Sequence, residues 1–165
     1  LGEIPQEYLG AYLTSHELAS SGIAEIAQFF SSRIPGPDVT PEELRERSWW
    51  KGAEGFVIVD DYDLVSTSQG NPLAVLQPLL AQAGDLGLHV ILTRRAGGAS
   101  RAAYDPIIQR FTDLGVTGIL LSGSPEEGAL IGRVKAQPAA PGRAQIVSRE
   151  HGQLAAQLAL PSSVH

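Results

Sequence analysis

Residues 55–61 read Gly-Phe-Val-Ile-Val-Asp-Asp, a continuous apolar run that ends in two carboxylates. An uninterrupted run of this length is typical of a strand whose two faces are both covered by helices. Acids directly behind the run put polar side chains where ligands of α/β proteins bind, at the carboxyl end of a strand. We therefore predict a buried strand over residues 55–60 inside an α/β domain.

Strand and helix patterns alternate around this run. The predicted strands cover residues 10–14, 55–60, 88–93 and 118–122, followed by a hairpin of 145–148 and 154–160 that turns at 150–152. The predicted helices cover 15–34, a short segment opening at 40–43, 71–83, 100–114 with a break near Pro106, and 124–132, with a loop at 136–141. This alternation predicts a mostly parallel sheet with helices on both faces.

The composition excludes several classes of protein. The chain has 165 residues, of which 43% are hydrophobic, enough for one core of ordinary size. A net charge of −6, with only 12 Lys and Arg, argues against binding nucleic acid through its phosphates. The absence of cysteine excludes disulfides and thiolate metal sites. No apolar run is long enough to cross a bilayer, and because the sequence starts at Leu1 rather than Met, we expect a part of a longer protein.

The four apolar residues before Asp60 and Asp61 fit the Walker B pattern of nucleotide-binding proteins. A Mg²⁺ ion on nucleotide phosphates needs a carboxylate at a rigid strand end. A second carboxylate beside it is suited to orient or deprotonate an attacking water. Acids also end many buried strands that bind nothing, so the pattern alone leaves both interpretations open.

The next predicted strand ends in Thr93, Arg94 and Arg95. A polar side chain at this point is placed to contact a terminal phosphate or to position water. The alternative is a solvated capping segment, because two glycines follow at 97 and 98. The two strand ends together favour a nucleotide site.

The phosphate-binding loop of such a site is absent from the sequence. The Walker A pattern requires Gly-x-x-x-x-Gly-Lys-Ser/Thr. The only lysines, Lys51 and Lys135, are followed by glycine and alanine. We therefore expect the Walker A strand and loop to lie outside this chain, and the chain by itself to be inactive.

The histidines and tryptophans have structural interpretations. His16, His89, His151 and His165 are too scattered for a metal site, and His89, inside a predicted strand, is expected to be a hydrogen-bonded core residue. Trp49 and Trp50 are expected to pack against the core, with contact to a partner protein as the alternative.

Several longer segments occur together in one order. They are Trp49-Trp50, 56–65, 87–89, 94–98, 104–106, 121–128 and Pro141-Gly142-Arg143. The series resembles the C-terminal ATPase domain of the EccC proteins, which are FtsK/SpoIIIE-type motors of actinobacterial type VII secretion. The resemblance covers the chain from Leu1 to about Leu160.

The resemblance implies a RecA-like P-loop NTPase fold that binds ATP with Mg²⁺, and residues 1–165 then form a single partial ATPase domain. Asp60 would be the carboxylate on the Mg²⁺ side of the nucleotide. Asp61 would be the catalytic acid, at a position where active motors usually have Glu. Thr93 would match the sensor position, and Arg94 stands where the family often has Gln, so both would contact the nucleotide.

The resemblance also implies partners. They are a secreted substrate of the WXG type, whose C-terminal signal docks on the last ATPase domain, and other ATPase domains or membrane subunits of the secretion machine. Related motors often work as rings. The implied location is the cytoplasm, at the inner face of the cell membrane.

Three interpretations remain open at this stage. The chain is half of an ATPase site, or a degenerate ATPase domain that binds protein without hydrolysing ATP, or an unrelated flavodoxin-like domain with acids at one strand end. The Asp at position 61 favours the second over the first, because its carboxylate is one methylene shorter than that of Glu. An exposed apolar groove away from Asp60 would favour the second as well.

Overall fold

A computed structural model describes residues 4–98 and 104–159 of the chain. The chain divides into two compact units, residues 1–94 and 95–165, which are considered separately. None of the helices in the described residues combines the length and the apolar character that a bilayer span requires.

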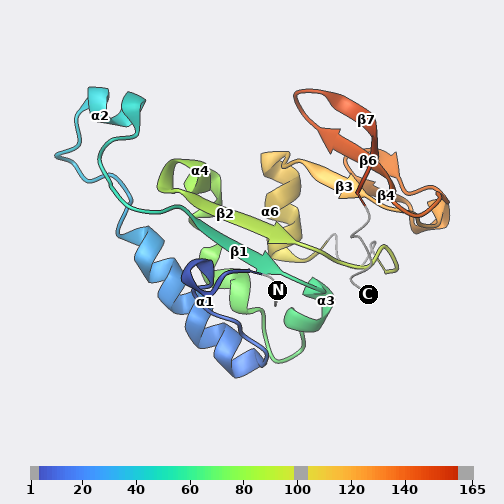
Figure 1. The fold of residues 1–165 in the computed structure, drawn as a ribbon, viewed down its shortest axis with the longest axis horizontal. Helices are drawn as coiled ribbons and strands as arrows, with labels where there is room; N and C mark the ends of the chain where they lie inside the picture. Colours follow the sequence, from blue (N-terminus) through green and yellow to red (C-terminus); the bar gives the residue numbers. More distant parts are fainter. Residues whose placement is uncertain (1–3, 99–103, 160–165) are drawn as a thin grey trace. The chain divides into compact units, whose positions relative to one another are not determined.

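The first unit is built around two parallel strands, β1 (Gly55–Val59) and β2 (Leu88–Leu92), which lie side by side in Figure 1. Their register runs from Gly55 opposite Leu88 to Val59 opposite Leu92. The prediction that the Walker B strand and the next strand are parallel neighbours is therefore confirmed. Their bounds also agree with the predicted runs to within one residue.

Helix α1 (His16–Ser31) supplies much of the core beside these strands. Ser15 caps it, accepting a hydrogen bond from the N–H of Leu18. Its buried residues Ile23, Ala27 and Phe30 repeat at helical spacing and so form one face. This helix packs against the short 3₁₀ helix η2 (Pro72–Leu76), whose Leu73 and Leu76 are fully buried.

Three further short α-helices and two further 3₁₀ turns belong to this unit. They are η1 (Gln6–Tyr8), α2 (Pro41–Glu46), α3 (Tyr62–Val65), η3 (Leu80–Gln82) and α4 (Ala83–Leu86). Helix α2 begins as predicted, with Thr40 and Glu43 forming a reciprocal capping box and Pro41 in the first turn. The loop that follows α2 leads to β1.

Three predictions for this unit are wrong in detail. Residues 10–14 form no strand. Residues 71–83 are not one α-helix but two 3₁₀ turns, because Pro78 in the middle of the run cannot donate a backbone hydrogen bond. The strand at 55–60 is not covered on both faces: Val57 and Val59 are buried, but Phe56 and Ile58 are 61% and 51% exposed.

The second unit carries helix α6 and two small antiparallel sheets. Helix α6 (Pro106–Leu114) starts at the proline where a break was predicted, because Asp105 caps it by accepting from the N–H groups of Ile107 and Ile108. Residues 100–103 of the predicted helix lie outside the described residues. The strands are β3 (Gly118–Leu120), β4 (Ala129–Ile131), β5 (Val134–Lys135), β6 (Arg143–Ser148) and β7 (Gly152–Gln157).

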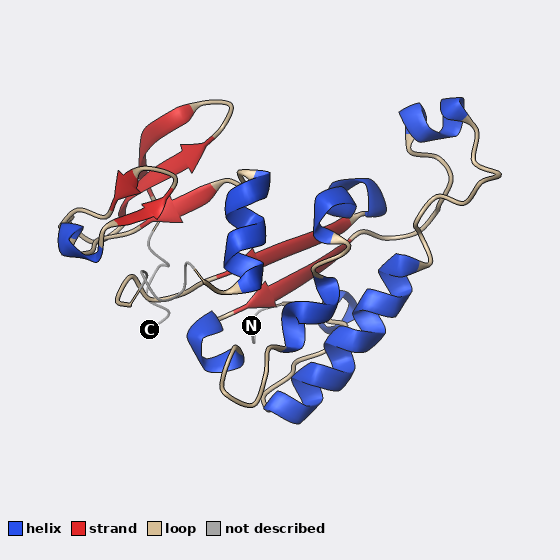
Figure 2. Ribbon diagram, turned by 180° about the vertical axis from the view of Figure 1, so that it is seen from behind, coloured by secondary structure: helices blue, strands red, loops and turns tan. Residues whose placement is uncertain are grey.

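The sheets of this unit differ from the mostly parallel sheet that was predicted. Strands β3, β6 and β7 form one antiparallel sheet in that order, and β4 pairs with β5 in another. Figure 2 shows these strands in red. Among the described strands only β1 and β2 pair in parallel. The alternation of strand and helix stops after β3, and the strands that follow form two antiparallel pairs, β4 with β5 and β6 with β7.

The predicted C-terminal hairpin is confirmed as β6 and β7. The predicted helix at 124–132 shrinks to a single 3₁₀ turn, η4 (Pro125–Glu127). Gly128 ends this turn with φ 82° and ψ −162°, a conformation that only glycine adopts readily, and β4 follows at once. The chain is thus a mixed α/β structure with small sheets.

Candidate functional site

The carboxyl ends of β1 and β2 meet at one edge of the parallel pair. Beyond the last strand residues the backbones stay paired: the N–H of Thr93 donates to the carbonyl of Val59 at 2.9 Å, and the N–H of Tyr62 donates to the carbonyl of Thr93 at 2.8 Å. This pairing holds residues 60–62 and residue 93 at fixed distances. Asp60 and Thr93 therefore lie together at the same edge, as the sequence predicted.

The hydroxyl of Thr93 joins the two acidic residues. It donates a hydrogen bond to Oδ1 of Asp60 at 2.8 Å and accepts one from the backbone N–H of Asp61 at 3.0 Å. A hydroxyl has one proton, and here that proton is directed at Asp60. Thr93 therefore orients the Asp60 carboxylate. Within the described residues no hydrogen-bond donor lies on the other oxygen of Asp60, which belongs to an exposed side chain.

Asp61 has a different local geometry. Its backbone lies in the left-handed region at φ 49° and ψ 61°, which Asp tolerates better than most residues. It immediately precedes α3 and makes no side-chain capping bond to that helix. The next residue, Tyr62, is 2% exposed, and its hydroxyl accepts a hydrogen bond from the side-chain amide of Asn71 at 2.6 Å. This buried tyrosine fixes the turn that presents Asp61.

Arg94 brings a positive charge to the acidic edge. Its guanidinium lies 3.2 Å from Oδ1 of Asp63, and its side chain is 19% exposed. The Nε atom of Arg94 is buried and has no hydrogen-bond partner in the described part of the chain. Arg94 is therefore anchored by its far end, and one of its donors is not satisfied by the protein.

These residues fit a magnesium ion only in combination with a ligand. The described residues contain no group of three or more His, Asp or Glu side chains that could hold a metal by themselves. Mg²⁺ is usually held by one or two carboxylates together with water and substrate phosphates, so one oriented carboxylate is compatible with a nucleotide-borne ion. The donor set fits Mg²⁺ on a phosphate and does not fit a structural metal.

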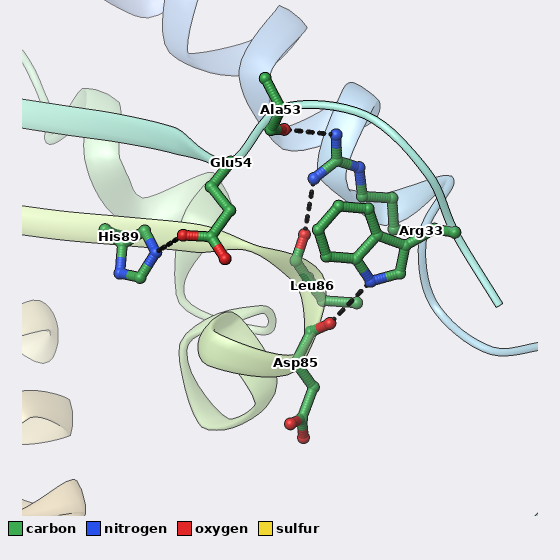
Figure 3. Close-up of polar contacts among 7 residues, drawn as sticks. Arg33, Ala53, Glu54, Asp85, Leu86 and His89 are labelled. Carbon is green, nitrogen blue, oxygen red and sulfur yellow. Dashed lines mark hydrogen bonds and ion pairs between the residues drawn. The ribbon is translucent and has the colours of Figure 1, made fainter. Parts of the chain in front are cut away.

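The opposite end of the strand pair is held by a buried arginine that the sequence analysis missed. Arg33 follows α1, is 6% exposed, and donates to the carbonyls of Leu86 at 2.9 Å and Ala53 at 2.8 Å (Figure 3). Its guanidinium lies 4.0 Å from the ring centre of Trp50, whose indole N–H donates to the carbonyl of Asp85. The two donated bonds tie the approach to β1 to the approach to β2.

This arginine network explains the neighbouring glycine and tryptophans. A Cβ on Gly87 would lie 2.6 Å from the Trp50 ring, so the ring occupies the space of a side chain. Trp49 donates to the carbonyl of Arg33 at 2.7 Å. The two tryptophans are packing residues, as predicted. An arginine at the end of an apolar helix face, followed by two tryptophans, was the available signal for the network.

His89 is hydrogen-bonded as predicted, but it is not in the core. Its Nε2 lies 2.8 Å from Oε2 of Glu54 (Figure 3), and its side chain is 38% exposed. Its ring stacks on Phe56 with centroids 4.5 Å apart. Both residues belong to the face of the strand pair that carries exposed apolar side chains.

Comparison with known proteins gives consistent matches. No family model matches the chain. The chain is 43% identical over 148 residues to the ESX-4 secretion system protein EccC4 of Mycobacterium tuberculosis, and 46% identical over 157 residues to the ESX secretion system protein EccC of Thermomonospora curvata. These matches cover 90% and 95% of this chain, but the chain spans only 12% of the length of each relative.

Solved structures agree with the sequence matches. The cytoplasmic domain of the T. curvata type VII secretion ATPase EccC superposes with a TM-score of 0.84 at 48% identity, covering 90% of this chain and 17% of that one. The chain is homologous to a segment of EccC. A second T. curvata structure, ATPases 2 and 3 of EccC in complex with a signal sequence peptide, gives the same TM-score and identity, and the match covers 27% of that chain. The resemblance seen in the sequence is therefore confirmed, and the fold is similar to that of the matching segment of T. curvata EccC.

Proposed function

We propose that the edge formed by β1 and β2 is one half of a Mg-nucleotide site in a longer EccC-type ATPase. The observation that carries this proposal is the Thr93 hydroxyl, which bridges the Asp60 carboxylate and the Asp61 backbone. The Thr93 side chain holds the two strand ends in register and orients Asp60, whereas the Asp61 carboxylate makes no hydrogen bond to any of the described residues. A merely solvated strand end has no need of this arrangement.

Each residue at the edge has a distinct proposed role. Asp60 faces the Mg²⁺ of a bound nucleotide through its second oxygen, directly or through water. Asp61 orients the attacking water from its left-handed turn. Thr93 keeps Asp60 in place, and Arg94, held by Asp63, contributes positive charge near the bound phosphates. When bound, Mg-ATP would supply the reacting phosphate and the charge that neutralises it.

The other half of the site must supply a phosphate-binding loop. Neither Lys51 nor Lys135 stands in a Walker A pattern. The parallel pair also has no further strand beside it in the described residues, and Phe56, Ile58 and Ile91 on one of its faces are about half exposed or more. Parallel sheets are normally covered on both faces. Residues 1–165 are thus proposed to be part of one RecA-like ATPase domain that further strands and helices complete.

The secretion role follows from the relatives. EccC4 of M. tuberculosis and EccC of T. curvata are ESX secretion system proteins. This chain is accordingly proposed to act in a type VII secretion motor, together with other ATPase domains or membrane subunits, at the cytoplasmic side of the membrane and in a ring. Its substrates are proposed to be WXG-type proteins.

Docking of the substrate signal is the second part of this function. The T. curvata EccC structure with a signal sequence peptide contains a segment 48% identical to this chain. A peptide docking through a few apolar anchors buries a modest area, so affinity of roughly micromolar strength is expected. The test is titration of a labelled C-terminal peptide of a co-encoded WXG-type protein, with a peptide whose apolar anchors are changed to Ala as the matched control. Equal binding of the two peptides would remove the docking role.

The nucleotide role is tested by Mg-ATP titration of a polypeptide in which this sequence is joined to a Walker A segment. Binding that Asp60→Ala weakens supports the assignment. The competing function, a degenerate domain that binds without hydrolysis, differs in one result: ATP binds to that polypeptide but is not turned over. If ATP binds with the same affinity after Asp60→Ala, neither version of the nucleotide site stands.

A further inference from the structure

The open edge of strand β7 is a surface that the nucleotide site does not use. β7 (Gly152–Gln157) is the last strand in the order β3-β6-β7, and in the described residues it has no neighbour on its outer side. Edge strands are usually protected by charged residues, proline or a bulge. β7 has none of these: its sequence is Gly-Gln-Leu-Ala-Ala-Gln, and it pairs with β6 through six consecutive residues without a register shift.

The register identifies the backbone groups that face outward. In an antiparallel pair, hydrogen-bonded residue pairs alternate with non-bonded ones. The N–H of Leu158 donates to the carbonyl of Gly142 at 2.7 Å, whereas the N–H of Arg143 turns away to the carbonyl of Ala140. The even-numbered residues of β7 therefore bond to β6. The N–H and C=O groups of Gln153, Ala155 and Gln157 point outward.

These outward groups are symmetric about Ala155. If a second β7 runs antiparallel with Ala155 opposite its own copy, Gln153 of each strand faces Gln157 of the other. All three outward residues then fall in hydrogen-bonded pairs, which exchange two backbone bonds each. Centring the pair on Gln153 or Gln157 instead leaves some of the outward groups without partners inside the strand. The strand is thus self-complementary in one register.

An exposed apolar row runs across the sheet to the same edge. Ile119 of β3, Ile146 of β6 and Leu154 of β7 are successive cross-strand partners, so their side chains share one face. Ile119 and Leu154 are 53% and 46% exposed. In the register centred on Ala155, Leu154 of one copy lies opposite Ala156 of the other, and the apolar row continues from one copy into the next. No charged residue within β7 opposes this approach.

We propose that two copies of this chain associate by antiparallel pairing of their β7 strands about Ala155. A six-residue edge buries much less than the roughly 1,200 Å² of a stable interface, so the association is weak and concentration-dependent. The net charge of −6 on each copy opposes it, and added salt strengthens it because the repulsion is screened. The proposal is independent of the nucleotide site.

The direct test uses single cysteines, since the chain has none of its own. In the proposed register only residue 155 faces itself, with Cα atoms about 5.5 Å apart, within the range of a disulfide. Residue 153 is displaced from its own copy by four residues, about 13 Å, which is too far. Under mild oxidation Ala155→Cys is expected to give a covalent dimer as its main product. Gln153→Cys alone is expected to stay monomeric, and a mixture of Gln153→Cys and Gln157→Cys to cross-link.

A second test uses charge without a covalent bond. The double variant Gln153→Lys, Gln157→Lys places like charges opposite each other and should associate about tenfold more weakly in sedimentation velocity. The matched variant Gln153→Glu, Gln157→Glu should do the same. An equimolar mixture of the two should recover or exceed the original association. Both positions are exposed, so circular dichroism should show unchanged folding.

Three outcomes would overturn the proposal. The chain stays monomeric at every concentration, or the cysteines at 153 and 155 cross-link equally well, or the charge variants do not rescue each other. Strand addition by an extended apolar peptide that leaves the chain monomeric would assign the edge to another protein, and so would also end the proposal. None of these results bears on nucleotide binding.

Discussion

Thr93 donates its only hydroxyl proton to Oδ1 of Asp60, across the parallel pair β1 and β2. The Thr93 hydroxyl oxygen also accepts a hydrogen bond from the backbone N–H of Asp61, so one side chain fixes both acidic residues at this edge. The geometry assigns Thr93 an orienting role for Asp60. Direct donation to a phosphate would require this bond to break first.

Replacing Thr93 tests that role. Thr93→Val keeps the shape of the side chain but removes both hydrogen bonds. In a polypeptide that also carries a Walker A loop, Mg-ATP affinity should fall about fivefold to tenfold, a cost of roughly 1–1.4 kcal/mol for the freed carboxylate. Thr93→Ser should restore most of the affinity, because it keeps the hydroxyl. If Thr93→Val binds as tightly as the parent in calorimetric titration, Thr93 does not orient Asp60.

The two acids should differ in importance. Asp60 directly ends the apolar strand and is held by Thr93, whereas Asp61 lies in a left-handed turn with no side-chain capping bond. In the same polypeptide Asp60→Ala should weaken Mg-nucleotide binding by about tenfold or more, and Asp61→Ala by much less. Asp61→Asn, which tolerates the left-handed backbone, separates loss of charge from backbone strain. Equal or reversed effects in a fluorescent-nucleotide assay would withdraw the assignment of roles.

The Arg33 network should contribute strongly to stability. Arg33→Met removes a buried hydrogen bond to the carbonyl of Leu86 and a partly buried one to the carbonyl of Ala53. The free energy of unfolding should fall by about 2–4 kcal/mol in urea denaturation. Arg45→Met, on an exposed side chain of α2, is the matched control and should change it by less than about 0.5 kcal/mol. A similar loss of unfolding free energy in both variants would show that Arg33 stabilises the fold no more than an exposed arginine does.

Acid should loosen the start of α2. Hydrogen bonds from the backbone and side chain of Thr40 lower the pKa of Glu43 below its ordinary value of 4.5. A carboxylate with a lowered folded-state pKa stabilises the fold above its ordinary pKa, and this contribution is lost as pH falls through the lowered value. The Thr40 amide, followed by NMR, should therefore lose its protection as the pH falls through the lowered pKa of Glu43, below 4.5. Glu43→Gln should remove the pH dependence, and an unchanged acid transition in that variant would contradict the assignment.

The sequence predicted the strand edge well because local signals and chemistry agreed there. The apolar runs before Asp60 and Thr93 define both strands, and the connection between them requires a parallel pair. Burial was harder to predict. The run of 55–59 was expected to be covered on both faces, yet Phe56 and Ile58 are exposed. An apolar pattern indicates that both faces of a strand are normally buried. It does not indicate whether the segments that bury them are among the described residues.

Longer-range features escaped the sequence for other reasons. In the sequence Arg33 looks like an ordinary surface arginine. Its partners are backbone carbonyls 20 and 53 residues away, and a backbone carbonyl can belong to any residue type, so the sequence does not reveal them. Pro78 was the signal against a single α-helix over residues 71–83. The spacing of the leucines is compatible with such a helix, and the prediction followed that spacing. After β3 the alternation of elements no longer held, and the antiparallel pairing of β3 with β6 depends on partners 25 to 29 residues away.

The central claim is that this chain holds only half of a nucleotide site, and calorimetric titration with Mg-ATP tests it most directly. The 165-residue chain alone should show no micromolar binding, because it lacks the Walker A lysine and the backbone N–H groups that surround the phosphates. The same chain joined to a Walker A segment should bind, and Asp60→Ala should abolish most of that binding. Micromolar binding by the chain alone, or binding by the joined polypeptide that is indifferent to Asp60, would contradict the account.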